Sequence, residues 1–281
     1  MTISSHQDLE VLRECGKRLA AIMAELIAAV RPGIATLELD RIAERLIREA
    51  GGAPAFKGYR TKRDDPPFPA SICGSINDEV VHGIPRSNRI LKPGDIVGLD
   101  IGMRWPAPQL PAASRPQPAR FRAAKLEAGL ITDMAMTVPV GRIPTQAEAL
   151  IAATERALRA GIAALRPGIW MGDLSHAIQQ AIESCGFAVV RELVGHGVGR
   201  HLHEDPYVPN FGQPGEGVRI KEGMVLAIEP MATAGSPLVM LDSDGWTWRT
   251  KDGSLAAHFE HTVVVTKEGA EVLTRIMNQE S

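Results

Sequence analysis

Apolar side chains recur along residues 8–30 at the spacing of one helix face, which predicts a long amphipathic helix. The segment RPG at 31–33 ends this pattern. A second helix is expected from Thr36 to about Ala50, because Thr36 can cap its first turn and Gly51 can adopt the left-handed conformation that ends a helix. The N-terminal segment therefore predicts a pair of helices.

A second pair of helices is expected in the other half of the chain. The segment TQAE at 145–148 predicts a capping box, in which Thr145 and Glu148 pair with free amides of a helix that runs to about Leu165. The segment RPGI then ends this helix, and a further helix is expected at about 173–185. The order of elements is thus repeated along the chain.

Acidic residues stand inside apolar, strand-like runs at four places. Residues 91–102, LKPGDIVGLDIG, contain the first, and residues 220–231, IKEGMVLAIEPM, repeat the pattern with a glutamate in the equivalent place. Desolvating an unpaired carboxylate costs several kcal/mol, so each acid must be paired, hydrogen-bonded or bound to a metal. The four acids are Asp100, Asp133, Glu229 and Glu260.

The two halves of the chain match at several places in the same order and at nearly equal spacing. This agreement indicates an internal duplication, in which two αβ halves related by a pseudo-two-fold axis each bring one histidine and two acids to a central site. The matched pairs are Asp100 with Glu229, Asp133 with Glu260, His82 with His203, and RPGI at 31–34 with RPGI at 166–169.

Charge counting predicts a metal site. Four converging carboxylates would repel one another, whereas two divalent cations balance their charge. His196, between Gly195 and Gly197, can add one nitrogen ligand, because the bare backbone permits close approach to an ion. Oxygen-rich ligation with one imidazole suits manganese, iron(II) or cobalt, and zinc stays open. Hydrolysis by a metal-activated water is the implied reaction class.

The sequence resembles the type I methionine aminopeptidases over nearly the whole chain except the loops at 60–67 and 104–129. The stretches that carry the resemblance are SINDEVVHGIP, DIVGLDIG, ITDMAMTVPVG, VVRELVGHGVGRHLHEDP, MVLAIEPM and DGWTWRTKDGSLAAHFEHTVVV. The resemblance implies an α+β pita-bread fold with two pseudo-symmetric αβ halves and a central curved antiparallel sheet. It implies a single catalytic domain, residues 1–281, with a proline-rich insertion at about 104–129.

The resemblance also implies the reaction, which is removal of the initiator methionine from nascent proteins whose second residue is small. By match to the motifs, Asp100 would hold one of two metal ions, and His196 and Glu229 would hold the other. Asp133 and Glu260 would bridge both ions.

The resemblance assigns further roles near the metals. His82 would lie near the substrate amine and the scissile amide nitrogen, His203 would hydrogen-bond the scissile carbonyl, and Glu229 would also move a proton. The methionine pocket would be formed by Tyr59, Phe68, Cys73, Leu202 and Trp246.

Two features depart from the family pattern. His201-Leu202 stands where relatives carry Gly-Phe, and on an extended segment His201 would point the same way as His203. The insertion separates the strands of Asp100 and Asp133, which we expect to pair as a hairpin with the insertion looped out of its tip.

Composition limits the alternatives. A net charge of −2 and a pI of about 6.5 give no overall attraction to nucleic acid or anionic lipid. Three widely spaced cysteines indicate no disulfide framework, and no long apolar window predicts a membrane span. We therefore expect a protein of the reducing cytoplasm. The family resemblance implies action on nascent chains and admits association with the ribosome, and we expect a monomer.

Two other functions stay open. One is a related peptidase selective for Xaa-Pro bonds. The other is a pita-bread protein that has lost catalysis and binds RNA or protein, although such a protein is expected to have lost metal ligands that this chain retains.

Overall fold

The computed structural model describes residues 2–3, 5–62, 64–107 and 129–276. Its helices are α1 (His6–Ala29), α2 (Thr36–Glu49), α3 (Thr145–Ala164) and α4 (Met171–Glu183). Its strands in the first half are β1 (Ala53–Pro54), β2 (Ile72–Ile76), β3 (Glu79–Val81), β4 (Ile96–Trp105) and β5 (Leu130–Pro139). The remaining strands are β6 (Ala188–Val189), β7 (Gly195–Gly197), β8 (Glu204–Val208), β9 (Val225–Ile228), β10 (Met231–Thr233), β11 (Val239–Leu241), β12 (Trp248–Thr250), β13 (Ala256–His258), β14 (Glu260–Thr266) and β15 (Gly269–Val272).

The four predicted helices are confirmed, but two predicted caps are wrong. Thr36 is the first residue of α2, and its hydroxyl exchanges two hydrogen bonds with the backbone of Arg86 instead of capping the helix. Pro144 occupies the N-cap position of α3, and no side-chain cap bond forms there. A cap motif in sequence predicts only that a helix begins nearby, because a long-range partner can claim the same hydroxyl.

The central sheet is antiparallel and has the path β1-β4-β5-β14-β9-β7-β8, with β2 added to β4 and β15 added to β14. The predicted hairpin is confirmed, since β4 and β5 pair from Ile96 with Pro139 to Trp105 with Leu130. Most of the insertion, residues 108–128, lies outside the described residues. The hairpin therefore places Asp100 and Asp133 on neighbouring strands.

Backbone contacts repeat between the halves, which confirms the predicted duplication. The Gly33 N–H donates to the Leu91 carbonyl at 2.8 Å, and the Gly168 N–H donates to the Ile220 carbonyl at 2.9 Å. Both glycines have positive φ, 87° and 91°, which a side chain would strain. The RPGI segments thus make the same turn against equivalent segments, which lead into β4 and β9.

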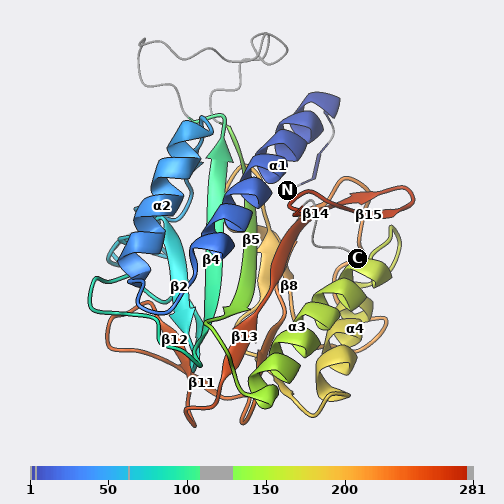
Figure 1. The fold of residues 1–281 in the computed structure, drawn as a ribbon. Coiled ribbons are helices and arrows are strands. Elements are labelled where there is room, and N and C mark those ends of the chain that lie inside the picture. Colours follow the sequence, from blue (N-terminus) through green and yellow to red (C-terminus); the bar gives the residue numbers. More distant parts are fainter. Residues whose placement is uncertain (1, 4, 63, 108–128, 277–281) are drawn as a thin grey trace.

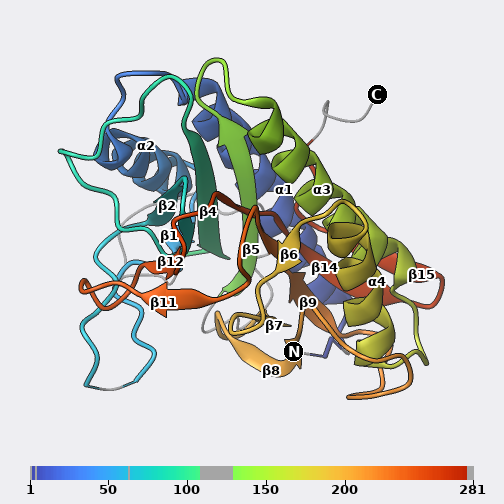
Figure 2. The same ribbon diagram turned by 90° about the horizontal axis from the view of Figure 1, so that it is seen from below.

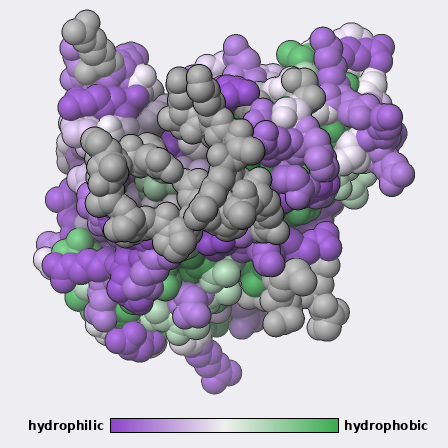
Figure 3. All heavy atoms as spheres, turned by 90° about the horizontal axis from the view of Figure 1, so that it is seen from above, coloured by the Kyte–Doolittle hydropathy of each residue, from purple (hydrophilic) through white to green (hydrophobic). Residues whose placement is uncertain are grey.

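Each half packs its own helices on the sheet. Helices α1 and α2 share one hydrophobic core with β2, β4 and β5, while α3 and α4 share a second core with β9 and β14. In Figure 2, α1, α2 and α3 lie on one side of β4 and β5, and β11 and β12 lie on the other. The face seen in Figure 3 is mostly hydrophilic where it is coloured. None of the described helices is both long enough and apolar enough to cross a membrane.

Asp40 links the first helix pair to the sheet. Its Oδ1 accepts hydrogen bonds from the backbone N–H groups of Ser71 at 2.7 Å and Ile72 at 3.2 Å, and the residue is 6% exposed. These bonds fix the start of β2, which leads to Cys73.

We predict that Asp40→Ala lowers the free energy of unfolding by about 2 to 4 kcal/mol, because it leaves two buried N–H groups without an acceptor. Urea denaturation of the purified protein measures this loss. Asp40→Asn retains an acceptor oxygen and should cost less than half as much. An unchanged urea midpoint in Asp40→Ala would show that these bonds contribute nothing net.

Candidate active site

The register of the central sheet places three acids on one face. Asp100 of β4 and Glu260 of β14 pair with Ala135 of β5 from opposite sides. Asp133 lies two residues before Ala135, so strand alternation turns its side chain to the same face. The three carboxylates therefore come from three neighbouring strands.

The second half adds the fourth acid and one imidazole. His196 of β7 pairs with Ala227 of β9, and Glu229 follows Ala227 by two residues, so both side chains face the same way. The pairing of β9 with β14 brings Glu229 beside Glu260. His196 Nε2 lies 3.4 Å from Glu229 Oε1.

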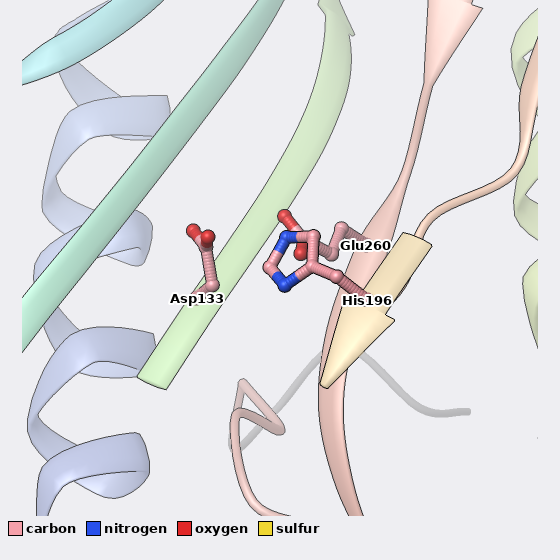
Figure 4. A group of neighbouring side chains, drawn as sticks. All are labelled: Asp133, His196 and Glu260. Atoms are coloured by element: carbon pink, nitrogen blue, oxygen red, sulfur yellow. The ribbon is translucent and has the colours of Figure 1, made fainter. Parts of the chain in front are cut away.

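The structure brings the five residues into one buried cluster. Asp133, His196 and Glu260 each offer one ligand atom within 4.8 Å of the others, and Figure 4 shows their side chains converging from β5, β7 and β14. Glu229 belongs to the cluster because its Oε1 lies 3.4 Å from His196 Nε2. Asp100 belongs to it because β4 pairs with β5, the strand that carries Asp133. All five are at most 9% exposed.

Burial raises the pKa of each of the four carboxyl groups. Desolvation is the largest cause for Asp100, whose pKa rises to about 7, and the charge of Glu229 adds to it. The pKa values of the other three are also raised well above their usual range, again chiefly through desolvation. Neighbouring carboxylates raise the pKa of Asp133 and Glu260 further. The cluster is thus costly to hold ionised without a cation.

The ring of His196 presents a lone pair to the cluster. Its Nδ1 lies 3.0 Å from the carbonyl oxygen of Gly197, and because a carbonyl only accepts, Nδ1 must carry the hydrogen. Desolvation lowers the pKa of His196 to about 3, so the ring is neutral and Nε2 is an acceptor. Two acceptors, His196 Nε2 and Glu229 Oε1, therefore face each other.

This donor set fits divalent cations. Asp100 Oδ1, Asp133 Oδ1 and Glu260 Oε1 are buried and have no hydrogen-bond partner among the described residues. Unpartnered carboxylate oxygens and a neutral imidazole are the ligand forms that a cation requires. The arrangement can therefore hold metal ions. A purely structural role would require hydrogen-bond donors to these oxygens, and none is present among the described residues.

His203 lies next to the cluster. Its ring centroid is 4.3 Å from that of His196, and its Nδ1 is 2.6 Å from the hydroxyl oxygen of Tyr59. Desolvation lowers the pKa of His203, although part of its surface remains open to solvent. This position, beside the cluster and reachable from outside, suits contact with a substrate.

His82 lies beside Trp246. Its ring centroid is 6.3 Å from that of Trp246, and desolvation lowers its pKa to about 4. Its φ of 60° places it in the left-handed region, which costs energy for a residue with a Cβ. The Thr247 hydroxyl donates to its carbonyl oxygen and supports this conformation.

The structure gathers the predicted pocket residues. The rings of Phe68 and Trp246 meet edge to face at 5.3 Å, and Cys73 pairs across the sheet with Asp100. Leu202 is buried and belongs to one hydrophobic cluster with Phe68, Cys73 and Trp246, and Tyr59 packs against this cluster. An apolar cluster therefore adjoins the acids.

The expectation for His201 is wrong. Residues 199–203 form bends instead of an extended strand, and His201 is exposed. Alternation of side chains holds only along extended backbone, so the spacing of His201 and His203 does not put both rings at the site.

One residue at the site was missed. His258 is 3% exposed, and its Nε2 lies 3.6 Å from Glu229 Oε2. The available signal was its place two residues before Glu260, although a short break at Phe259 separates β13 from β14.

Comparison with known proteins agrees with this geometry. The model of metallopeptidase family M24 matches residues 10–107 and 123–267. Methionine aminopeptidase 1 of Bacillus subtilis is 46% identical over 270 residues, which cover 96% of this chain and 97% of that protein. Methionine aminopeptidase 1 of Mycobacterium tuberculosis is 41% identical over 273 residues, 95% of this chain and 92% of that protein.

Solved structures show the same fold. The methionine aminopeptidase of Thermotoga maritima superposes with a TM-score of 0.85 at 38% identity, covering 98% of this chain and all of that one, 100%. A prolidase from Pyrococcus horikoshii, at 19% identity and a TM-score of 0.72, covers 99% of this chain and 65% of its own, and shows the pita-bread fold alone. The chain therefore belongs to metallopeptidase family M24 and, within it, to the methionine aminopeptidases.

Proposed function

We propose that this chain removes the N-terminal methionine from nascent proteins with a small second residue, by hydrolysis of the first peptide bond. The observation that carries the proposal is the cluster of four buried carboxylates and one neutral imidazole beside an apolar cluster that includes Phe68 and Trp246. The methionine aminopeptidases that match almost the entire chain support it.

We assign two divalent ions to this cluster. Asp100 would hold one ion, His196 and Glu229 the other, and Asp133 and Glu260 both. When bound, the ions would supply a water molecule activated for attack on the peptide bond, and they would balance the four negative charges. Manganese, iron(II), cobalt and zinc all suit such ligands.

Around the ions, His203 is assigned to donate a hydrogen bond to the scissile carbonyl. A neutral imidazole carries one hydrogen, so a ring that donates from Nε2 must accept at Nδ1. The Tyr59 hydroxyl at 2.6 Å can be that donor, and desolvation raises the pKa of Tyr59, which keeps its hydrogen in place. With Tyr59 as the donor, His203 can present Nε2–H to the negative charge developing on the carbonyl oxygen.

Two further groups act on the reacting atoms. His82 is assigned to the substrate amine and the scissile nitrogen, and Glu229 to proton transfer toward that leaving nitrogen. The methionine side chain would lie against Phe68 and Trp246. A flexible thioether suits such a site, because it is apolar, unbranched and makes favourable contacts with aromatic rings.

We infer one catalytic domain over residues 1–281, acting as a monomer in the cytoplasm, where nascent chains emerge from the ribosome. A reducing compartment agrees with the three free cysteines, which form no disulfide.

The substrate is tested with metal-reconstituted protein and three peptides, Met-Gly-Met, Met-Lys and Ala-Pro. We expect cleavage of Met-Gly-Met alone, because the pocket accepts methionine and the second residue must be small. Release of free methionine, measured by chromatography, gives the rate. Cleavage of Ala-Pro alone would contradict the proposal and favour an Xaa-Pro peptidase.

Asp133→Asn tests the bridging role. Removal of this charge should cost at least one bound ion and lower activity on Met-Gly-Met by about a hundredfold or more, because a ligand shared by both ions is lost. Calorimetric titration with Mn²⁺ counts the ions. Binding of two ions at unchanged affinity would show that Asp133 does not bridge.

The buried carboxyl groups predict how the metal-free protein responds to pH. Their pKa values are raised on folding, so the folded state binds more protons than the unfolded state and stability falls as pH rises. The neutral histidines have lowered pKa values and oppose this trend only below their unfolded pKa of about 6.5.

We therefore expect the melting temperature of protein treated with a chelator to fall between about pH 6.5 and pH 8. Added Mn²⁺ should raise the melting temperature most at pH 8, where the carboxylates are most ionised. Differential scanning fluorimetry measures both effects. A melting temperature that rises over this interval without metal would contradict the assigned charge state of the cluster.

A further inference from the structure

His258 has a fixed position beside the acids but no role in the assignments above. Its backbone is held from both sides, since its N–H donates to Thr137 Oγ1 at 2.9 Å and its carbonyl accepts from the same hydroxyl at 2.9 Å. β13 also pairs with β10, where His258 lies opposite Met231. The ring is therefore carried by a rigid part of the fold.

The two oxygens of Glu229 face two different rings. Oε1 lies 3.4 Å from His196 Nε2, and Oε2 lies 3.6 Å from His258 Nε2. His258 Nε2 is buried and has no hydrogen-bond partner among the described residues. A shift of a few tenths of an ångström would bring Oε2 within hydrogen-bond distance of this nitrogen.

We propose that His258 is a positioning residue, whose Nε2–H donates to Glu229 Oε2 and holds the carboxylate with Oε1 turned toward His196. The proposal rests on the assignment of Glu229 as metal ligand and proton carrier. A carboxylate with both oxygens free can rotate, whereas one anchored oxygen leaves the other in a defined place. Partners of this kind are worth about 10- to 100-fold in metal affinity or activity.

Because the site is buried, a hydrogen bond from the His258 ring to Glu229 would stabilise the site more than the same bond at an exposed position. In a buried site, an unpaired donor and an unpaired carboxylate oxygen each carry a desolvation cost, and a bond between them removes both. The same ring would be a poor structural filler, because its Nε2 would then remain unpaired in the core.

Two substitutions separate positioning from packing. His258→Leu fills the space without a donor, and His258→Gln carries an amide N–H near the place of Nε2. His261→Gln is the matched control, because His261 lies on the opposite face of β14, where its Nδ1 is 3.0 Å from Thr274 Oγ1.

Calorimetric titration with Mn²⁺ alone is the first measurement, and kcat and KM for Met-Gly-Met are the second. We expect His258→Leu to weaken at least one Mn²⁺ site by about tenfold and to lower kcat by about tenfold or more, with KM changed less than about twofold. His258→Gln should recover both quantities to within about threefold of the parent, and His261→Gln should stay within about twofold.

The proposal is overturned if His258→Leu retains Mn²⁺ affinity and kcat within about twofold. It is also overturned if His258→Gln is as impaired as His258→Leu, since the ring would then act as a metal ligand or by shape. Should His258→Leu fail to fold, as judged by its melting curve, His258→Met replaces it. Failure of the parent to cleave Met-Gly-Met would remove the proposed function, while the Mn²⁺ titrations would still decide the role of His258.

Discussion

The structure depends on four carboxylates held close together out of water. Each would cost several kcal/mol if desolvated alone, and their mutual repulsion adds to this cost. One oxygen each of Asp100, Asp133 and Glu260 is buried without a hydrogen-bond partner among the described residues. Only added protons or bound cations can balance this arrangement. The fold tolerates this unfavourable free energy because the large hydrophobic cores of both halves hold the strands in register.

The duplication explains why the acids come in pairs, and the central strand pair explains why the pairs meet. Asp133 on β5 is joined to β14 by the Thr262 hydroxyl, which accepts from the Asp133 N–H at 2.8 Å and donates to its carbonyl at 2.7 Å. This contact fixes one half against the other at the acids themselves. The halves differ in what they add, since the first places Cys73 opposite Asp100 and the second places His196 beside Glu229. The duplication thus accounts for the four carboxylates, and the difference between the halves accounts for the single imidazole among them.

Local periodicity and internal repetition were sufficient to predict the helices and the convergence of the acids, whereas the β4-β5 hairpin was expected from the family resemblance. These features depend on spacing along one element or on equivalence between halves. The Thr36 cap failed because a residue distant in sequence, Arg86, takes its hydroxyl. The place of His258 was not predicted for a related reason, because β13 belongs to a different sheet and its approach to Glu229 is set by the Thr137 contact. The pocket residues were named only through the family resemblance, since side-chain contacts across loops leave no periodic signal.

Under the proposed assignments, Tyr59 belongs both to the methionine pocket and to the surroundings of His203, so selectivity and rate would be coupled in this site. Tyr59 packs against the hydrophobic cluster, yet its hydroxyl lies 2.6 Å from His203 Nδ1 and its ring meets the His203 ring at 5.0 Å. A substitution at Tyr59 would therefore also remove a hydrogen-bond partner and a ring contact of His203. Phe68 meets the rings of Phe56 and Trp246, whereas the Trp246 ring lies 6.3 Å from that of His82, the residue assigned to the substrate amine. Under these assignments, a substitution at Phe68 would leave the contacts of both histidines in place, whereas Tyr59 contacts His203 and Trp246 contacts His82.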